Sequence, residues 1–308
     1  MNLKSLNIPV IDFVGRRKYA MIFSAILLII SIASIGFQGL KFGIDFTGGT
    51  LIELGYEKTA DLEDIRSKLA SADFNGANVQ YFGSDTEVLI QLEPQAASSA
   101  KLSSSIIRML GEGIDVRRVE FVGPKVGEEL TNDGGLAMLY ALIGILIYVA
   151  FRFEYRFALG SIAALIHDVV ITLGIFSLLQ IEFDLTVLAA ILAVIGYSLN
   201  DTIVVFDRIR ENFLATRHVE PGPIVNEALN QTLSRTLMTS LTTLLVLFAL
   251  FYLGGEVIHS FAGALLIGVI IGTYSSIYVA SSTILAMGIS KEDMLPSEKE
   301  KKEIDARP

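Results

Sequence analysis

Long stretches with almost no charge are the feature that most limits how this chain can fold. A membrane-spanning helix needs about 20 mostly apolar residues, because the hydrocarbon core is roughly 30 Å thick and a helix rises 1.5 Å per residue. Runs of about that length recur over residues 20–37, 136–151, 157–181, 185–206, 237–253 and 257–289. The sequence therefore predicts a membrane all-α bundle of about six helices.

Composition argues against several classes of function. Charged residues make up 19% of the 308 residues, below the about 25% typical of soluble domains. With no Cys and three His, neither a disulfide framework, a thiol nucleophile nor a Cys- or His-rich metal site is expected. A net charge of −9 argues against nucleic-acid binding, and no Gly-x4-Gly-Lys-Ser/Thr loop is present to bind ATP. We therefore expect no cofactor.

The first apolar stretch has two interpretations, a cleaved signal peptide or a signal anchor. Its run is longer than the about 7–15 apolar residues of a usual signal peptide. No clear small-x-small cleavage site follows it before the soluble segment begins. These features favour an anchor that stays in the membrane.

Basic residues gather in alternate short loops, which predicts the orientation of the chain. They are Arg16, Arg17 and Lys18 before the first stretch, Arg152 and Arg156 after the second, Arg208, Arg210, Arg217 and Arg235 after the fourth, and Lys291, Lys299, Lys301 and Lys302 after the sixth. The loops around 180–184 and 254–259 contain no Lys or Arg. Since basic loops stay in the cytoplasm, both termini are predicted to be cytoplasmic and the long insert periplasmic.

The chain is thus expected to have five parts. They are a cytoplasmic N-terminus (1–18), a first transmembrane helix (19–40), a periplasmic domain (41–132), transmembrane helices two to six with a cytoplasmic loop at 207–234 (133–289), and a cytoplasmic tail (290–308).

The insert alternates between strand-like and helix-like patterns. We expect strands at 50–57, 78–82, 87–92 and 115–122, helices at 61–72 and 97–110, Asp61 as an N-cap, and a turn at 83–85. This β-α-β-β-α-β order predicts an α+β ferredoxin-like domain. The insert has no Ser-His-Asp arrangement and no metal-ligand spacing, which favours binding or mechanical movement over catalysis.

The cytoplasmic loop contains a short amphipathic pattern from Pro223 to Leu233. Ile224, Ala228 and Leu229 share one face, which could lie on the membrane interface. A connector that packs on the helix ends is the alternative, and it stays open at this point.

Four stretches together resemble one known family. They are FGIDFTGGT at 42–50, VEFVGPKVG at 119–127, the pair His167-Asp168, and GYSLNDTIVVFDRIREN at 196–212. They are similar to the SecF branch of the SecD/SecF family, protein-export membrane subunits of the resistance-nodulation-division superfamily. Within the first two stretches, the resemblance marks Asp45, Thr47, Gly48, Gly49, Gly123 and Pro124 as family motif and hinge positions.

The resemblance implies a function that composition could not show. Such subunits lie in the bacterial inner membrane and carry a ferredoxin-like periplasmic domain after the first span. With a SecD-like partner, beside a SecYEG-type channel and other Sec accessory proteins, they are thought to use the proton gradient to pull unfolded exported chains outward. This chain has only one six-helix half, so the SecD-like half is expected to be a separate polypeptide.

Asp201 and Arg235 are the ionisable residues that the pattern places inside the membrane at matching depth. Asp201 lies five residues before Phe206, roughly 7.5 Å inside the cytoplasmic end of the fourth stretch. Burial opposes ionisation of a carboxyl and a nearby guanidinium favours it, so Asp201 could take up and release a proton. The resemblance likewise implicates both positions in proton passage, and a static ion pair stays the alternative. Further polar residues that could extend this pathway are Asn200, Thr239 and Thr243.

Other charged residues have weaker functional interpretations. His167 and Asp168 could relay protons, since His titrates near pH about 6.5, or Asp168 could only fix the tautomer of His167. Asp207, Arg208 and Arg210 are interpreted as topology anchors at the membrane edge.

Small residues predict close helix contacts. Ala264, Gly268, Gly272, Ser276 and Ala280 recur every four residues along the sixth stretch, a face that lets another helix approach. Whether that helix belongs to this chain or to a partner stays open, and Gly196 is a further candidate for packing. Gly48 and Gly49 permit positive φ, as a hinge or, the interpretation we favour, as a fixed turn.

Two rival functions remain. An efflux pump of the same superfamily usually has about twelve spans and two large inserts in one chain, twice what is found here. A membrane scaffold without transport activity would gain little from charges such as Asp201 within its spans.

Overall fold

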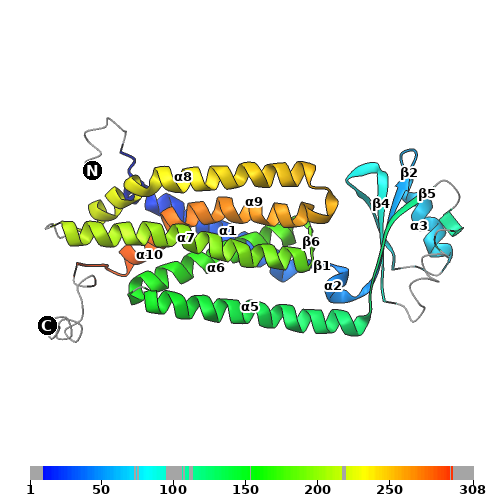
Figure 1. Ribbon diagram of the computed structural model, residues 1–308, viewed down its shortest axis with the longest axis horizontal. Helices are drawn as coiled ribbons and strands as arrows, with labels where there is room; N and C mark the ends of the chain where they lie inside the picture. Colours follow the sequence, from blue (N-terminus) through cyan, green and yellow to red (C-terminus); the bar gives the residue numbers. More distant parts are fainter. Residues whose placement is uncertain are drawn as a thin grey trace, which may run out of the picture.

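The computed structural model describes residues 10–72, 74, 76–94, 106, 108–110, 114–152, 154–216, 220–291 and 293. Within these residues, six helical segments are long and apolar enough to cross a membrane. They lie roughly side by side, and a small β-sheet stands at one end of the bundle (Figure 1). The observed architecture is therefore a membrane helical bundle with a sheet-containing unit inserted after the first span.

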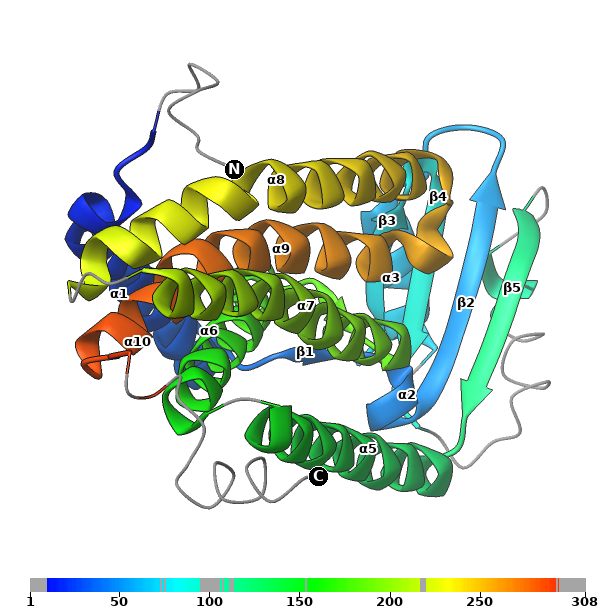
Figure 2. The same ribbon diagram turned by 60° about the vertical axis from the view of Figure 1, so that its left-hand side comes forward.

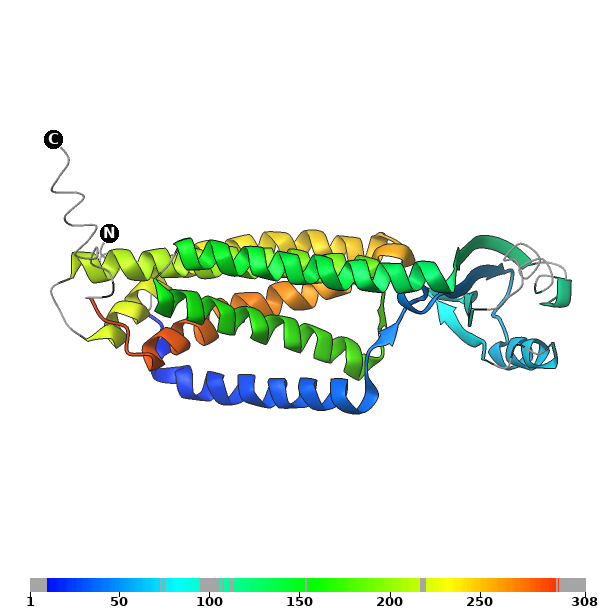
Figure 3. The ribbon, with the colours of Figure 1, turned by 90° about the horizontal axis from the view of Figure 1, so that it is seen from below.

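The spans follow the apolar runs of the sequence. They are α1 (Phe13–Gln38), α5 (Pro124–Arg152), α6 (Tyr155–Leu179), α7 (Leu185–Ala215), α8 (Pro221–Leu253), and a last span built from α9 (His259–Ser275), the π-helical η3 (Ser276–Ala280) and α10 (Ser281–Ala286), preceded by the 3₁₀ turn η2 (Glu256–Ile258). Helices α6, α7 and α9 form the buried centre of the bundle. Figure 3 shows α1 and α5 on opposite sides of it.

Several helices extend beyond the predicted spans, α5 and α7 among them. Helix α5 begins at Pro124, inside the segment 41–132 that was assigned to the soluble domain, and α7 continues past Phe206 to Ala215. Hydropathy identifies only the apolar part of a helix, whereas backbone hydrogen bonding continues into its charged turns. Pro124 suits the first turn, where its missing N–H costs nothing.

Of the two interpretations of residues 223–233, the structure supports packing on protein and contradicts a helix on the membrane interface. These residues form the first turns of one continuous helix, α8. Ile224, Ala228 and Leu229 are buried in the main bundle core together with Phe13 of α1, so their apolar face packs on protein. The side chain of Asn226 accepts hydrogen bonds from the backbone N–H of Phe13 at 2.8 Å, at the start of α1. This part of α8 therefore caps and buries the first helix.

The soluble unit contains an antiparallel sheet with strand order β3-β4-β2-β5. Its strands are β2 (Gly49–Tyr56), β3 (Asn78–Phe82), β4 (Ser84–Leu92) and β5 (Ile114–Val122), and helix α3 (Leu62–Ser71) follows β2. As predicted, Asp61 is the N-cap of α3, and its side chain accepts from the N–H groups of Glu63 and Asp64. The helix predicted at 97–110 lies largely outside the described residues.

The two faces of the sheet have different partners. Ile52 and Leu54 of β2 point to one face and form a core with Ile65 and Leu69 of α3. Leu51 points to the other face, with Leu89 of β4 and Ile44. Strands β2 and β5 cross the ends of the bundle helices at a steep angle (Figure 2). One face of the sheet is therefore covered by its own helix, and the other takes part in the junction with the bundle.

A short parallel pairing connects the sheet unit to the bundle, and sequence patterns did not predict it. Strand β1 (Lys41–Phe42), directly after α1, pairs with β6 (Glu182–Phe183), which lies between α6 and α7. The rings of Phe42, Phe46 and Phe183 pack together at this point. The four-residue helix α2 (Ile44–Thr47) then leads into β2.

Candidate functional site

Asp201 is buried in the bundle and retains an unused acceptor atom. Its side chain is 4% exposed, and among the described residues its Oδ2 has no hydrogen-bond partner. The hydroxyls of Tyr197, one turn earlier on α7, and of Thr236 on the neighbouring helix α8 are likewise buried and unpartnered. A buried polar atom without a partner costs about 1–3 kcal/mol. The seam between α7 and α8 therefore contains polar groups that packing alone does not explain.

Arg235 does not form the expected ion pair with Asp201 within the part of the chain that the structure describes. Its side chain is exposed on α8. Asn200 is exposed as well. The hydroxyls of Thr239 and Thr243 donate to backbone carbonyls of α8 itself, at 3.1 Å and 2.9 Å. The predicted row of contacting polar side chains is therefore not formed. Helical spacing places residues on one face, but it does not determine whether their side chains touch.

His167 and Asp168 form the centre of a fully buried polar network. Nδ1 of His167 lies 2.9 Å from Oδ1 of Asp168, and its Nε2 lies 3.1 Å from the hydroxyl of Ser24 on α1. The other oxygen of Asp168 accepts from Ser198 of α7 at 2.5 Å and from Ser275 of α9 at 2.7 Å. The two titratable residues therefore connect four helices of the bundle.

Asp45, in the first motif, is fixed at the start of α7. Its Oδ2 accepts a hydrogen bond from the backbone N–H of Leu185 at 3.0 Å. Asp184 is the N-cap of the same helix and accepts from Val187 at 2.8 Å. Carboxylates at this end complement the partial positive charge of a helix N-terminus. The soluble unit is thereby linked to the helix that carries Asp201 about midway along its length.

Positions 48 and 49, shortly after Asp45, require glycine, both because of their backbone conformation and because neighbouring atoms leave no room for a side chain. Gly48 and Gly49 have φ values of 69° and 135°, which side chains strongly disfavour. A Cβ at Gly49 would overlap the carbonyl oxygen of Leu92, and one at Gly127 of α5 would lie 2.9 Å from the nitrogen of Gly48. The hydroxyl of Thr47 donates to the carbonyl of Gly43 at 3.1 Å. The first motif thus forms a tightly packed turn against α5, whose first residue, Pro124, follows Gly123.

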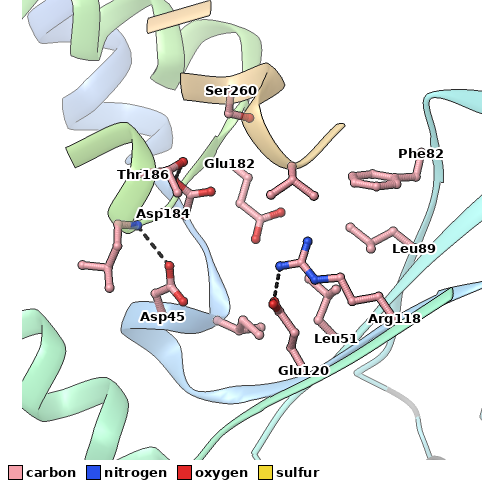
Figure 4. A pocket seen from close by; sticks show the side chains of 13 residues that line it. Asp45, Leu51, Phe82, Leu89, Arg118, Glu120, Glu182, Asp184, Thr186 and Ser260 are labelled. Carbon is pink, nitrogen blue, oxygen red and sulfur yellow. Dashed lines mark hydrogen bonds and ion pairs between the residues drawn. The ribbon is translucent and has the colours of Figure 1, made fainter. Parts of the chain in front are cut away.

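A cleft of about 370 Å³ lies between this junction and the open face of the sheet (Figure 4). Leu51, Phe82 and Leu89 provide an apolar wall. Its polar lining consists of Asp45, Arg118, Glu120, Glu182, Asp184, Thr186 and Ser260, and Arg118 forms an ion pair with Glu120. The cleft is therefore both apolar and acidic.

Glu182 lies half-buried in this cleft. Burial raises the pKa of its carboxyl; Lys41 lowers the pKa, and Asp184 and Asp45 raise it again, so the net shift is upward from 4.5. The folded state therefore holds the proton of Glu182 more tightly than the unfolded state does, and the protonated carboxyl stabilises the fold. This contribution to stability is complete at pH values below the pKa that Glu182 has in the unfolded state. That stability is lost as pH rises through the folded pKa.

We expect Glu182→Gln to remove this pH dependence. The variant should gain stability relative to the parent as pH increases from about 4 to about 8, because glutamine has no proton to lose. Thermal unfolding in detergent at several pH values measures the difference. Glu129→Gln, an exposed carboxylate at the start of α5, is the control. Parallel pH profiles for the parent and Glu182→Gln would contradict the prediction.

The small-residue face of the last span packs within this chain. A Cβ at Gly268 would overlap the side chain of Val194 on α7, and one at Gly272 would lie 3.0 Å from the Cβ of Ser198. Gly196 has no such neighbour in this chain, because a Cβ there would meet nothing within 4 Å, so its role in packing stays a prediction. Gly196 lies on the exposed side of α7. In the last span, by contrast, the small residues spaced four apart lie on the side that contacts α7.

Residues at the membrane edge are held by surface ion pairs. Arg152 at the end of α5 donates to both carboxylate oxygens of Asp207, at 2.8 and 2.7 Å, and Arg208 pairs with Glu211. Such exposed pairs contribute about 0–1 kcal/mol. Their role as topology anchors stays a prediction.

Sequence reasoning missed Ser24, Ser198, Tyr274 and Ser275, which complete the network around His167 and Asp168. Hydroxyl-bearing residues are common in spans, and spacing along the sequence does not distinguish these four from the others. Only the packing of four helices identifies them.

Comparison with known proteins gives consistent matches. The profile of "Protein export membrane protein SecD/SecF, C-terminal" matches residues 103–290, and that of the "SecD/SecF GG Motif" matches residues 33–60. The curated "Protein translocase subunit SecF" of Vibrio alginolyticus is 54% identical over 97% of each chain. The protein of the same name from Magnetococcus marinus is 57% identical over 90% of this chain and 91% of its own.

Two solved structures are similar along nearly the whole chain. The crystal structure of SecDF, "a translocon-associated membrane protein", from Thermus thermophilus has a TM-score of 0.84 and 40% identity over 91% of this chain. SecDF in a "Super-membrane-facing form" has a TM-score of 0.68 and 39% identity over 97% of this chain. This chain spans 39% and 40% of those two chains.

Proposed function

This chain belongs to the SecD/SecF family of protein-export membrane proteins, and on that premise we propose that it is the SecF-type subunit of a bacterial Sec protein translocase. It is a multi-pass protein of the inner membrane with six candidate spans. The observation that supports the assignment best is 54% identity to a SecF subunit over 97% of both chains. On this proposal it is a transport subunit without a reaction of its own.

The proposed partner is a SecD-like polypeptide. This chain covers about two-fifths of the SecDF chains that it resembles (39% and 40%). A SecD-like polypeptide then supplies the remainder, and the pair works beside a SecYEG-type channel and other Sec accessory proteins on unfolded exported chains.

Asp201 is proposed as the residue that takes up and releases protons as the proton gradient is used. Its support is a carboxylate at 4% exposure with an unused acceptor oxygen, in a seam of further unpartnered hydroxyls. Arg235 lies on the neighbouring helix α8, with its side chain exposed. Asn200, Thr239 and Thr243 are proposed as further polar positions along this path.

The inserted unit is proposed as a ferredoxin-like periplasmic domain. Its strand order β3-β4-β2-β5 is compatible with that fold, in which the first and third strands are central. Both termini are proposed to be cytoplasmic, since the described parts of the basic segments, 154–156, 207–216 and 220–235, lie toward the end of the bundle away from the sheet (Figure 1).

A labelling experiment tests this topology. In this Cys-free chain, Ser84→Cys in the sheet unit should react with a membrane-impermeant maleimide added from the periplasmic side. Glu220→Cys, at the opposite end, should react only after the membrane is opened. The reverse pattern would contradict the orientation.

Co-purification tests the proposed translocase role. After mild detergent extraction, an affinity-tagged chain should bring down a SecD-like subunit and Sec channel subunits from bacterial inner membranes. An unrelated tagged six-span protein at the same abundance is the control. Recovery of the chain without any SecD-like subunit, even after chemical cross-linking in intact membranes, would contradict the proposal.

A further inference from the structure

Two pairs of helices approach each other most closely at small residues in the bundle. Helices α1 and α6 approach so closely at Gly174 that a Cβ there would overlap Ser31, and Ser34 and Ser177 share a hydrogen bond of 2.9 Å. Helices α7 and α9 meet closely at Gly268 and Gly272. The network around His167 and Asp168 connects the first pair to the second.

Counting donors shows how many protons this network needs. The hydroxyl of Tyr274 donates to the carbonyl of Ala20 at 2.6 Å, so it can only accept from Ser24, 3.0 Å away. Ser24 has one proton, and giving it to Tyr274 leaves none for His167. The contact of 3.1 Å between Ser24 and Nε2 of His167 then needs a proton on that nitrogen.

The opposite side of the imidazole needs a proton as well. Nδ1 of His167 and Oδ1 of Asp168 are 2.9 Å apart, which two lone pairs facing each other would not allow. The pair therefore needs two protons, one on Nε2 and one between Nδ1 and Oδ1. That is one more than a neutral imidazole beside a carboxylate provides.

The net charge of the buried His167–Asp168 pair also indicates that it holds two protons. His167 is 2% and Asp168 0% exposed, and a neutral imidazole beside a carboxylate would leave a net negative charge in the bundle, which is strongly unfavourable. No Lys or Arg lies in the α6 stretch 157–181. The titratable groups facing the pair are the phenols of Tyr274 and, behind it, Tyr278 of the last span. Helices α1 and α7 contribute the hydroxyls of Ser24 and Ser198; Asp201 follows Ser198 by three residues on α7.

We infer that His167 and Asp168 form a proton-binding site in the bundle, separate from Asp201. The bound proton makes the pair neutral and completes every contact from Asp168 to Ala20. Its loss leaves Ser24 with one proton for two acceptors, so Ser24 keeps only one of its contacts, either to Tyr274 of α9 or to His167 of α6. Occupancy therefore controls how Ser24 of α1 is bonded to its neighbouring helices. The site lies beside η3, a π-helical distortion of a kind that is frequent at functional sites. This inference does not depend on the proposed export function.

Nitrogen NMR of the histidine rings tests the site directly. The chain has three His, so His218→Gln with His259→Gln leaves only His167. In the ¹⁵N-His-labelled protein in lipid nanodiscs at neutral pH, we expect a proton on Nε2. A bare Nε2 with the proton on Nδ1 under these conditions would overturn the inference.

Two further variants separate the proton-binding role from general packing. Tyr274→Phe frees the Ser24 proton to donate to Nε2, so the midpoint for losing the Nε2 proton should move to lower pH. Thr172→Val is the matched control, because its hydroxyl donates only to the backbone carbonyl of Asp168, at 2.7 Å. Equal midpoints in both variants would contradict the role of the Ser24–Tyr274 contact.

Discussion

Gly268→Leu is expected to reduce accumulation of the protein several-fold. A Cβ at this position already overlaps the side chain of Val194 on α7, and leucine adds three more carbons beyond it. Over-packing of this kind typically costs about 1–3 kcal/mol, and a loss of about 1–2 kcal/mol can change cellular abundance several-fold. Quantitative immunoblotting of membranes, together with thermal unfolding in detergent, measures the effect.

Gly144→Leu is the control for this substitution. It changes the same residue type within a long apolar helix, α5, at an exposed position where a Cβ meets nothing within 4 Å. Both substitutions remove a helix glycine, so the gain in helix propensity is shared, and only the contact with α7 differs. Equal abundance and equal unfolding temperature of the two variants would show that α7 and α9 are not packed as described.

The six spans could be predicted from sequence because hydropathy over about 20 residues depends on little else. The strands of the insert were predictable from short apolar or alternating runs bounded by turn residues; β5 alternates, whereas β2 is buried on both faces. The ends of α5 and α7 were not, because charged helical turns outside the membrane have no hydropathy signal. The face of α8 around Ile224 was apolar as predicted, but sequence could not distinguish a membrane surface from the core that includes Phe13.

The candidate sites were predictable in part. A carboxylate within an apolar stretch identified Asp201 and Asp168, because the cost of burying a charge makes such residues rare. What each carboxylate contacts depends on rotamers and helix rotation, which periodicity does not specify. For this reason the expected contact of Asp201 with Arg235 is absent among the described residues, whereas Asp168 has partners on α7 and α9 that no pattern indicated.

Asp201→Asn is expected to abolish stimulation of export by the proton gradient. Asparagine keeps the size of the side chain but cannot titrate, so folding and assembly with the partner should be preserved. One charge moved through about 100 mV corresponds to about 2.3 kcal/mol, enough to shift a two-state equilibrium roughly forty-fold. Loss of the titrating group removes that bias.

Asp207→Asn is the matched control, on the same helix six residues further along. Its carboxylate pairs with Arg152 at 38% side-chain exposure, so its loss costs about 0–1 kcal/mol. Stimulation by the gradient should survive in this variant. Lower assembly of Asp201→Asn alone would point to a structural ion instead, so co-purification with the SecD-like subunit accompanies the assay.

The most direct test of the proton-driven role measures export of a secreted protein into inverted inner-membrane vesicles, with and without a proton gradient. Vesicles with the parent chain and with Asp207→Asn should export more when the gradient is present. Vesicles with Asp201→Asn should show the same export in both conditions. Equal stimulation by the gradient in all three would contradict proton transfer through Asp201.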